Sequence, residues 1–347
     1  MAVKFVEGFE GHTNSGQLAR RYATFSGSFS TQTGRTFGNA ASPASAQATS
    51  KSLGNADTWI LGFGLKMTGH NSQIDDNNNG LYLEDGAAEQ FHVGFLSTSG
   101  VGFRVKLFRG GTELATTGDF AFNVWHYFEL KVTINNTTGS YELRRNGVVE
   151  FSDTNANTAA NGNTGADVFA WRFGNNIAQA HFDDLYLCDD QGGVNDDFLG
   201  PQIVEAIEVI GNGATSDWIN DQSGVSDANN YTQVDDAGNL APDDVGAGGT
   251  VSSDTNAQRQ LFQMGDLVNV NGNVTAVVVE AQLAMASAGT RTVKVKIGTD
   301  DAPGGSFVVD QTAFDEFSVV MDVNPADASA WDVSDVDGME PGLEVVS

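Results

Sequence analysis

Basic residues are scarce in this 347-residue chain, which has 17 lysines and arginines, 45 aspartates and glutamates and a formal net charge of −28. Binding to phosphate groups requires many lysine and arginine side chains, so the composition argues against a nucleic-acid partner. It argues equally against an anionic membrane surface, which attracts basic segments. We interpret the negative charge as a surface that keeps copies of the protein apart in solution; a specific cationic partner or ion is the alternative.

Cysteine is almost absent, because Cys188 is the single one, and this excludes an internal disulfide framework. Cys188 lies in a strand-like run and is predicted to be a small core residue. No apolar stretch is long enough to span a bilayer, and the opening sequence MAVKFVEGFEG has no apolar segment of a signal peptide. We therefore expect neither membrane insertion nor export by a cleaved signal.

Helical periodicity is lacking as well, whereas 41 glycines and many short polar residues indicate short strands joined by turns. The clearest pattern runs from Phe122 to Phe151. Apolar side chains alternate with polar ones between His126 and Ile134, which is typical of a strand with one face on a core. Asn146-Gly147 then predicts a tight hairpin turn, because both residues tolerate positive φ. Three strands that fold back and forth, a β-meander, predict an all-β antiparallel protein.

The composition changes near residue 200. Glycines, acids and a proline make residues 191–201 a predicted linker. From Gly200 onward there are 4 basic and 24 acidic side chains, compared with 13 and 21 before it. We therefore predict two β-sandwich domains, residues 1–190 and an acidic domain of residues 202–347.

Within these domains, four segments carry specific predictions. Residues 11–58 are polar and rich in glycine and serine, and the alanine and serine tract from Ala40 to Ser52 within them is predicted to be a loop that lies over a surface. Residues 202–210 are predicted to open the second domain with a strand. Residues 274–285 and 290–298 alternate strongly and are predicted to pair as a hairpin.

At the meander the chain resembles the concanavalin A-like, laminin-G-like jelly rolls. The resemblance is carried by Trp125-His126-Tyr127-Phe128-Glu129-Leu130-Lys131-Val132, Thr138-Gly139-Ser140-Tyr141-Glu142-Leu143 and Arg145-Asn146-Gly147-Val148. Phe182-Asp183-Asp184-Leu185-Tyr186-Leu187 matches the family's closing strand, which returns to pair near the first strand. The resemblance covers residues 1–190 and implies a jelly roll there. It leaves function open, since the family includes lectins, glycosidases and passive structural modules.

The order of sandwich, linker and second β domain is similar to virion structural proteins of tailed bacteriophages. The most telling piece is Asn195-Asp196-Asp197-Phe198-Leu199-Gly200, and Trp331 and Gly338 close the second domain. The resemblance implies a non-enzymatic virion protein, either a capsid decoration or head fibre, or a tail fibre or baseplate component. It implies assembly in the host cytoplasm as a homo-oligomer, with other virion proteins and host-surface glycan as partners. The alternative is a lectin-like carbohydrate-binding protein or an inactive relative of the glycosidases.

Candidate sites are few. The Glu-x-Asp-x-x-Glu pattern of glycosidases in this fold class is absent, and the nearest cluster, Glu84, Asp85 and Glu89, flanks Gly86, which indicates a turn. We therefore predict no catalytic residue and no enzymatic activity. The histidines have no metal-binding spacing and are predicted to be structural. Trp59, Trp125 and Trp171 are predicted to be buried; an exposed sugar-stacking platform is the alternative.

One segment resembles the start of a calcium loop. Asp75, Asn77 and Asn79 offer oxygen ligands at alternate positions and Gly80 stands at the sixth position. The twelfth position is Gly86, where a calcium loop has a bidentate glutamate. We predict an Asx-rich turn and no cofactor; a calcium ion held by these three residues is the alternative.

Overall fold

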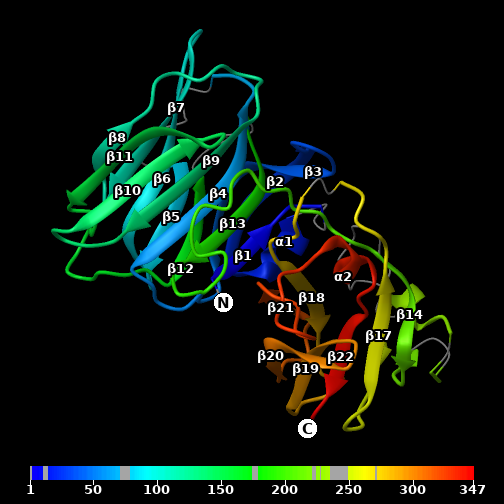
Figure 1. The fold of residues 1–347 in the computed structure, drawn as a ribbon. Coiled ribbons are helices and arrows are strands. Elements are labelled where there is room, and N and C mark those ends of the chain that lie inside the picture. The colour runs from blue at the N-terminus through cyan, green and yellow to red at the C-terminus, as the bar shows by residue number, and fades with distance from the viewer. Residues whose placement is uncertain are drawn as a thin grey trace. The chain divides into compact units, whose positions relative to one another are not determined.

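The computed structural model describes residues 2–10, 15–70, 79–173, 179–220, 224–226, 228–234, 249–269 and 272–347. The chain divides into two compact units, Met1–Val204 and Glu205–Ser347. In both, nearly all of the regular secondary structure consists of antiparallel strands, which confirms the predicted all-β fold with two sandwiches (Figure 1). Among these residues, no helix has the length and apolar character to cross a membrane.

The first unit is a jelly roll in which one path of hydrogen-bonded strands folds over on itself. One side consists of β1 (Val3–Glu7), β4 (Thr58–Met67), β9 (His126–Thr133), β10 (Gly139–Arg145), β11 (Val148–Ala156) and β13 (Ala180–Asp189). The other consists of β2 (Tyr22–Thr33), β3 (Asn39–Ser50), β5 (Asn79–Asp85), β6 (Ala88–Thr98), β7 (Gly102–Arg109), β8 (Thr112–Thr116) and β12 (Val168–Phe173). The two sides are joined where Phe182 of β13 pairs with Ala41 of β3.

The predicted meander is confirmed by β9, β10 and β11. β10 pairs with both of its neighbours in the sequence, and Asn146 and Gly147 have φ angles of 51° and 80° in the turn between β10 and β11. The closing strand β13 pairs with β1, as the family resemblance implied. The stretch that carried the clearest alternation therefore forms one wall of the jelly roll.

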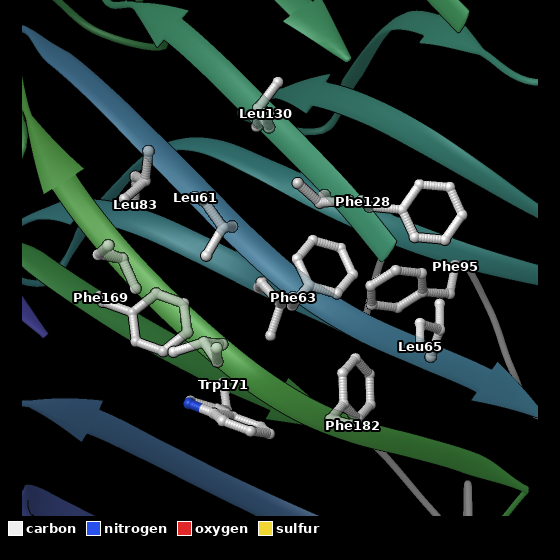
Figure 2. Packing of buried hydrophobic residues seen from close by; sticks show 14 of the residues in the cluster. Leu61, Phe63, Leu65, Leu83, Phe95, Phe128, Leu130, Phe169, Trp171 and Phe182 are labelled. Carbon is white, nitrogen blue, oxygen red and sulfur yellow. The ribbon is translucent and has the colours of Figure 1, made fainter. Parts of the chain in front are cut away.

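Aromatic rings from both sides of the jelly roll meet in one core (Figure 2). Phe63 of β4 packs against Phe95 of β6 with ring centroids 6.0 Å apart, and Phe182 of β13 packs against Phe95 at 5.5 Å. Trp59 and Trp171 are buried, as predicted. The rings remove large apolar areas from water and favour edge-on contacts, which is the main stabilisation available to this unit.

Other predicted core positions have mixed outcomes. Cys188 is a free cysteine buried in β13, and His126 is buried on the apolar face of β9, both as predicted. Trp125 is only half-buried, and the Lys66 ammonium lies 4.8 Å from its ring centroid. The prediction of burial is therefore confirmed for two of the three tryptophans of this unit.

The predicted surface loop from Ala40 to Ser52 is wrong over most of its length, because β3 extends to Ser50. Residues 15–50 form α1 (Ser15–Arg21), β2 and β3, and β3 runs between β13 and β12 in the sheet. β3 is buried along most of its length although it is rich in alanine and serine. Such small residues have little intrinsic preference for strands, so close packing against neighbours such as Trp171 decides their conformation.

The predicted linker, residues 191–201, packs on the first unit. Gly200 N–H donates to Glu129 Oε1 at 2.8 Å, and Val204 N–H donates to Asp184 Oδ1 at 2.8 Å. The boundary between the units therefore falls after Val204. Buried carboxylates require hydrogen-bond donors, and the backbone of this segment supplies them.

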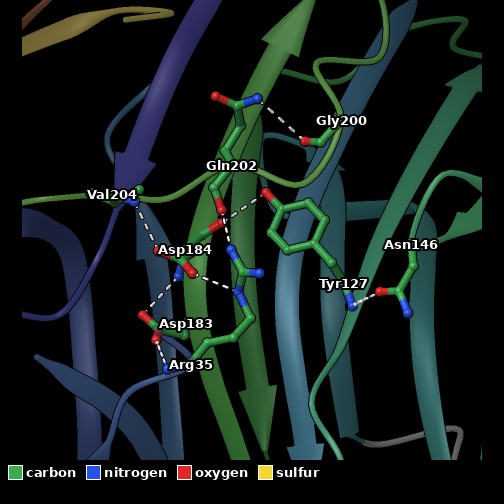
Figure 3. A network of polar contacts seen from close by, with 8 residues as sticks. All are labelled: Arg35, Tyr127, Asn146, Asp183, Asp184, Gly200, Gln202 and Val204. Atoms are coloured by element: carbon green, nitrogen blue, oxygen red, sulfur yellow. Dashed lines mark hydrogen bonds and ion pairs between the residues drawn. The ribbon is translucent and has the colours of Figure 1, made fainter. Parts of the chain in front are cut away.

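A β-bulge in β13 explains why acids gather beneath this segment (Figure 3). The pairing of β13 with β4 shifts between Asp183 and Tyr186, and Asp184 has a φ of 51°. Successive side chains of a regular strand point to opposite faces, but the bulge lets both aspartates meet Arg35. Arg35 N–H donates to Asp183 Oδ2 at 2.5 Å, and Arg35 Nε donates to Asp184 Oδ2 at 2.7 Å. The Arg35 guanidinium also lies 4.9 Å from the centre of the Tyr127 ring.

The second unit is a smaller sandwich around its own apolar core. A five-stranded sheet has the order β14 (Val209–Ser216), β17 (Arg259–Met264), β22 (Pro341–Val345), β19 (Arg291–Ile297) and β20 (Asp300–Val309). Two further pairs are β18 (Val277–Leu283) with β21 (Asp315–Met321), and β15 (Ile219–Asn220) with β16 (Val251–Ser252). Two short helices complete the described elements: η1 (Asn230–Gln233) and α2 (Val333–Asp337).

Two predictions for the second unit are wrong. β18 and β19, expected to form a hairpin, pair with different partners: β18 with β21, and β19 with β20 and β22. Their alternation was recognised correctly, but alternation says which side chains share a face and not which strand lies alongside. Residues 202–208 form no strand.

Candidate functional site

Three buried rings line up across the face of β5, β6 and β7 that is opposite the core. Tyr82 lies opposite His92 in the pairing of β5 with β6, and His92 lies opposite Phe108 in the pairing of β6 with β7. The His92 ring is stacked between the other two, with centroids 4.5 Å from each. Residues next to them along the strands, such as Leu81 and Leu107, belong to the core, so the three rings face away from it.

A charged pair continues this row on the neighbouring strand β12. The Arg172 guanidinium lies 4.9 Å from the centre of the Tyr82 ring and forms an ion pair with Glu84. The Arg172 side chain is 35% exposed and that of Glu84 only 1%. The buried carboxylate and the ring therefore hold a guanidinium that remains accessible to a ligand.

A second carboxylate, Glu89, lies opposite Glu84 at the start of β6. Glu89 Oε1 is 2.7 Å from His92 Nδ1, and the Glu89 side chain is 23% exposed whereas that of His92 is 1% exposed. The buried imidazole thus positions an accessible carboxylate, as the buried glutamate positions Arg172. We call Tyr82, Glu84, Glu89, His92, Phe108 and Arg172 together the ladder face.

The environments of the two glutamates move their pKa values in opposite directions. Burial raises the pKa of Glu84, with a further contribution from the negative charge of Glu89, although Arg172 opposes both. Burial also acts to raise the pKa of Glu89, but the hydrogen bond and charge of His92 outweigh it and the pKa is lowered. Glu84 therefore holds a proton more tightly than Glu89 does, which is the ordering expected of a paired acid and base.

The remaining neighbours tie the ladder face to the surrounding chain. Gln90 is fully buried; its Nε2 donates to Asn161 Oδ1 at 2.9 Å, and its Oε1 accepts from Ala160 N–H at 3.3 Å. On β7 the Lys106 ammonium lies 3.0 Å from Glu113 Oε2. The loop before β12 is thus held against the start of β6 by the hydrogen bonds of Gln90.

Sequence reasoning named Glu84, Asp85 and Glu89 but set them aside because a turn separates them. The turn is present, with Gly86 at a φ of 59°, and it is what folds β6 back so that Glu89 faces Glu84. The other members of the ladder face were missed: Tyr82, His92, Phe108 and Arg172. Their signal was available as aromatic and charged residues on the polar side of alternating strands, but pairing them required the register between strands.

The structure describes only one of the three predicted calcium ligands. Asp75 and Asn77 lie outside the described residues, and Asn79 is buried at the start of β5, opposite Phe173 of β12. Within the part of the chain that the structure describes, no group of three or more His, Cys, Asp or Glu side chains is arranged to hold a metal. The choice between an Asx-rich turn and a calcium loop stays a prediction.

Comparisons with known proteins find similarity in structure only. No protein-family model matches the chain, and no curated protein matches it in sequence. Alginate lyase Aly36B is similar with a TM-score of 0.37 and 9% identity, over 53% of this chain and 96% of the lyase. Domain 4 of AbnA, a GH43 extracellular arabinanase from Geobacillus stearothermophilus in complex with arabinotriose, has a TM-score of 0.37 and 15% identity, over 54% and 93%. A sialidase is similar with a TM-score of 0.33 and 8% identity, over 54% of this chain and 18% of the sialidase.

These comparisons bear on two predictions. An alginate lyase and a sialidase are enzymes, and their similarity to this chain contradicts the prediction that it is not an enzyme. None of the structures named above is a virion protein, so the virion role, its partners and its location stay predictions from the sequence.

Proposed function

We propose that the first unit binds carbohydrate chains through the ladder face. The observation that carries the proposal is the arrangement of Arg172 and Glu89. Both are accessible, and each is held by a buried partner: Arg172 by Glu84 on the neighbouring strand β5, and Glu89 by His92 on its own strand β6. A guanidinium that donates and a carboxylate that accepts, both fixed in orientation, suit a ligand that carries many hydroxyl groups.

Burial of charged groups away from the core supports a role in binding. Glu84 is 1% exposed on the outer face of a sheet, a position where an ion pair contributes little to stability and its desolvation is costly. Acids whose pKa values are shifted by burial and by a specific charged partner, and that gather with a cation on one surface, are characteristic of functional sites. An apolar ligand would cover the exposed parts of Arg172 and Glu89 without offering them hydrogen bonds, so a polar, hydroxylated ligand fits best.

The test measures binding of the whole protein to soluble polysaccharides by affinity electrophoresis. We expect Glu89→Ala to weaken binding about tenfold, the effect of losing one charge-assisted hydrogen bond. The double variant Glu84→Gln/Arg172→Gln should do the same without leaving a buried charge unpaired. Arg144→Gln, which removes a comparably exposed arginine from β10, is the control. Absence of binding by the unaltered protein to neutral and anionic polysaccharides alike would refute the proposal.

A second candidate function, chemical processing of the bound glycan, is favoured by the opposite pKa shifts of Glu84 and Glu89. Glu84, whose pKa is raised, would act as the acid, and Glu89, whose pKa is lowered, would act as the base. Activity would then require a pH above the pKa of Glu89 and below that of Glu84. Release of reducing ends from a bound polysaccharide, abolished by Glu89→Gln, would support this candidate; binding without any release would leave carbohydrate binding alone.

A further inference from the structure

A polar hollow of about 380 Å³ lies beside the turn that joins β5 to β6. It is lined by Asn55, Asp85, Gly162, Asn163, Thr164 and Gly165. Asp85 directly follows Glu84 of the ladder face, and Asn161, which holds Gln90 of β6, lies in the same loop as Asn163. The hollow therefore adjoins one end of the proposed binding face, and its volume falls within the roughly 300–1,000 Å³ of small-molecule sites.

The walls of the hollow come from three separate segments, which hydrogen bonds join to one another. Ala56 and Ala166 exchange backbone hydrogen bonds of 3.0 and 2.9 Å, which join the segment before β4 to the loop before β12. Gly86 N–H donates to Asp167 Oδ1 at 2.8 Å, which joins the β5–β6 turn to the same loop. A side chain at Gly165 would press on Asn55 Oδ1, so glycine allows this close approach. A site fixed in this way loses little entropy when a ligand binds.

The chemistry of the lining selects the ligand. Asn55, Asn163 and Thr164 can each donate and accept hydrogen bonds, whereas Asp85 accepts only; Asp85 also accepts a hydrogen bond from the Asn163 amide. No apolar side chain lines the hollow, which disfavours an apolar ligand. The single charge is negative, so an anionic sugar would be repelled. Neutral sugar hydroxyls, which both donate and accept, match this set.

We infer that the hollow is a subsite for a neutral sugar unit of the carbohydrate chain, an inference that rests on the proposed function. Two substitutions test it. Gly162→Leu should fill the hollow without strain, because a Cβ at Gly162 meets no atom within 4 Å. Asp85→Asn keeps the size of the side chain but removes the acceptor's charge.

Matched controls come from the same unit. Gly118→Leu adds the same side chain at another glycine whose Cβ would meet no atom within 4 Å. Asp153→Asn removes a charge from an exposed position of β11. The melting temperature and near-ultraviolet circular dichroism of each variant establish that it is folded.

The experiment measures retardation of the full chain in gels that contain neutral polymers (arabinan, galactomannan, β-glucan) or anionic polymers (alginate, polygalacturonate). We expect at least one neutral polymer to bind, with affinity about tenfold lower for Gly162→Leu and Asp85→Asn and within about twofold for the controls. If only anionic polymers bind, or if both variants bind like the unaltered protein, the subsite is refuted while carbohydrate binding stands. If no polymer binds, the proposed function itself fails. Calorimetric titration with calcium in the absence of sugar is the last measurement. Heat of binding that the unaltered protein shows and Asp85→Asn does not would assign the hollow to a cation and overturn the inference.

Discussion

Glu10, which is half-buried, and Asp183, which is buried, are carboxylic acids close to one another in the first unit. Burial, followed by repulsion from Asp183, raises the pKa of Glu10 to about 10. Burial, followed by repulsion from Asp184, raises the pKa of Asp183 to about 8. Arg35 supplies one positive charge for this group of acids, too little to keep all of them ionised. Both acids are therefore protonated in the folded protein at neutral pH.

These shifts predict how stability depends on pH. In the unfolded chain both acids lose their protons near pH 4, so between about pH 5 and 8 the folded state binds more protons than the unfolded state. The free energy of unfolding should therefore decrease as the pH rises through this range, by up to about 1.4 kcal/mol per pH unit for each group. Urea unfolding at pH 5 and pH 8 measures this decrease.

Glu10→Gln isolates the contribution of one acid. The amide has the shape of the protonated carboxyl and cannot ionise, so the variant should be more stable than the unaltered protein at pH 8 and should lose stability less steeply above pH 5. Asp153→Asn, at an exposed position, is the control and should leave the slope unchanged. An identical pH profile for Glu10→Gln and the unaltered protein would contradict the assignment.

The segment from Phe198 to Val204 behaves as part of the first unit. The Arg144 guanidinium lies 3.7 Å from the centre of the Phe198 ring, and Leu199 N–H donates to the Tyr186 hydroxyl at 3.3 Å. Together with the hydrogen bonds of Gly200 and Val204, these contacts complete the partners of buried side chains on β9 and β13. Truncating the chain before this segment therefore removes hydrogen-bond donors and packing contacts of the first unit as well as the connection to the second.

We predict that a fragment ending at residue 204 is markedly more stable than one ending at residue 190. The shorter fragment loses donors to two buried carboxylates, Glu129 and Asp184. At about 1.5–3 kcal/mol for each such hydrogen bond, the loss is at least about 3 kcal/mol, or roughly 6–12 °C in melting temperature for a unit of this size. Thermal unfolding of the two fragments, followed by circular dichroism, measures the difference. Equal melting temperatures would restore the interpretation of residues 191–201 as a free linker.

In the second unit, β22 lies between β17 and β19, and Gly342 marks a close approach of their backbones. A Cβ at this position would overlap the carbonyl oxygen of Gln260. Because the obstacle is backbone in the middle of a sheet, we expect Gly342→Ala to lower the free energy of unfolding by about 2 kcal/mol or more. Gly272→Ala, where a Cβ meets no atom within 4 Å, is the control. A Gly342→Ala variant as stable as this control would argue against the pairing of β22.

The distribution of charge differs sharply between the two units. The second unit has 4 basic and 24 acidic side chains, a net charge of −20, whereas the first has 13 and 21, a net charge of −8. Self-repulsion of this size opposes the compact state, and dissolved salt screens it within about 10 Å at 0.1 M and about 3 Å at 1 M. Ionic strength should therefore affect the two units unequally.

We predict that sodium chloride raised from about 0.02 M to 0.5 M increases the melting temperature of the second unit more than that of the first. Differential scanning calorimetry of the whole chain measures both transitions. They are assigned by Gly342→Ala, which should lower one, and by Glu10→Gln, which should change the other at pH 8. A larger shift for the first unit would mean that specific pairs such as Lys296 with Asp301 already relieve the repulsion in the second.

Alternation of apolar and polar residues was sufficient to predict the β class, the meander and its Asn146-Gly147 turn. These features depend on neighbours in the sequence, and the hydrophobic effect acts on each strand directly. The burial of Cys188 and His126 followed for the same reason. The alanine- and serine-rich β3 escaped prediction because its side chains carry no alternation, and only its place between β12 and β13 makes it a strand.

The sequence by itself therefore determined the all-β class of this protein, its division into two acidic sandwiches and the strands and turns of one wall of the jelly roll. The tertiary structure alone decided which strands pair, because pairing joins residues far apart in the chain and the periodic pattern is the same for every partner. That pairing places Tyr82, His92 and Phe108 in one row, brings Glu89 opposite Glu84 and sets Arg172 beside them. The candidate site therefore depends on the register between strands, which is set by contacts between residues far apart in the sequence.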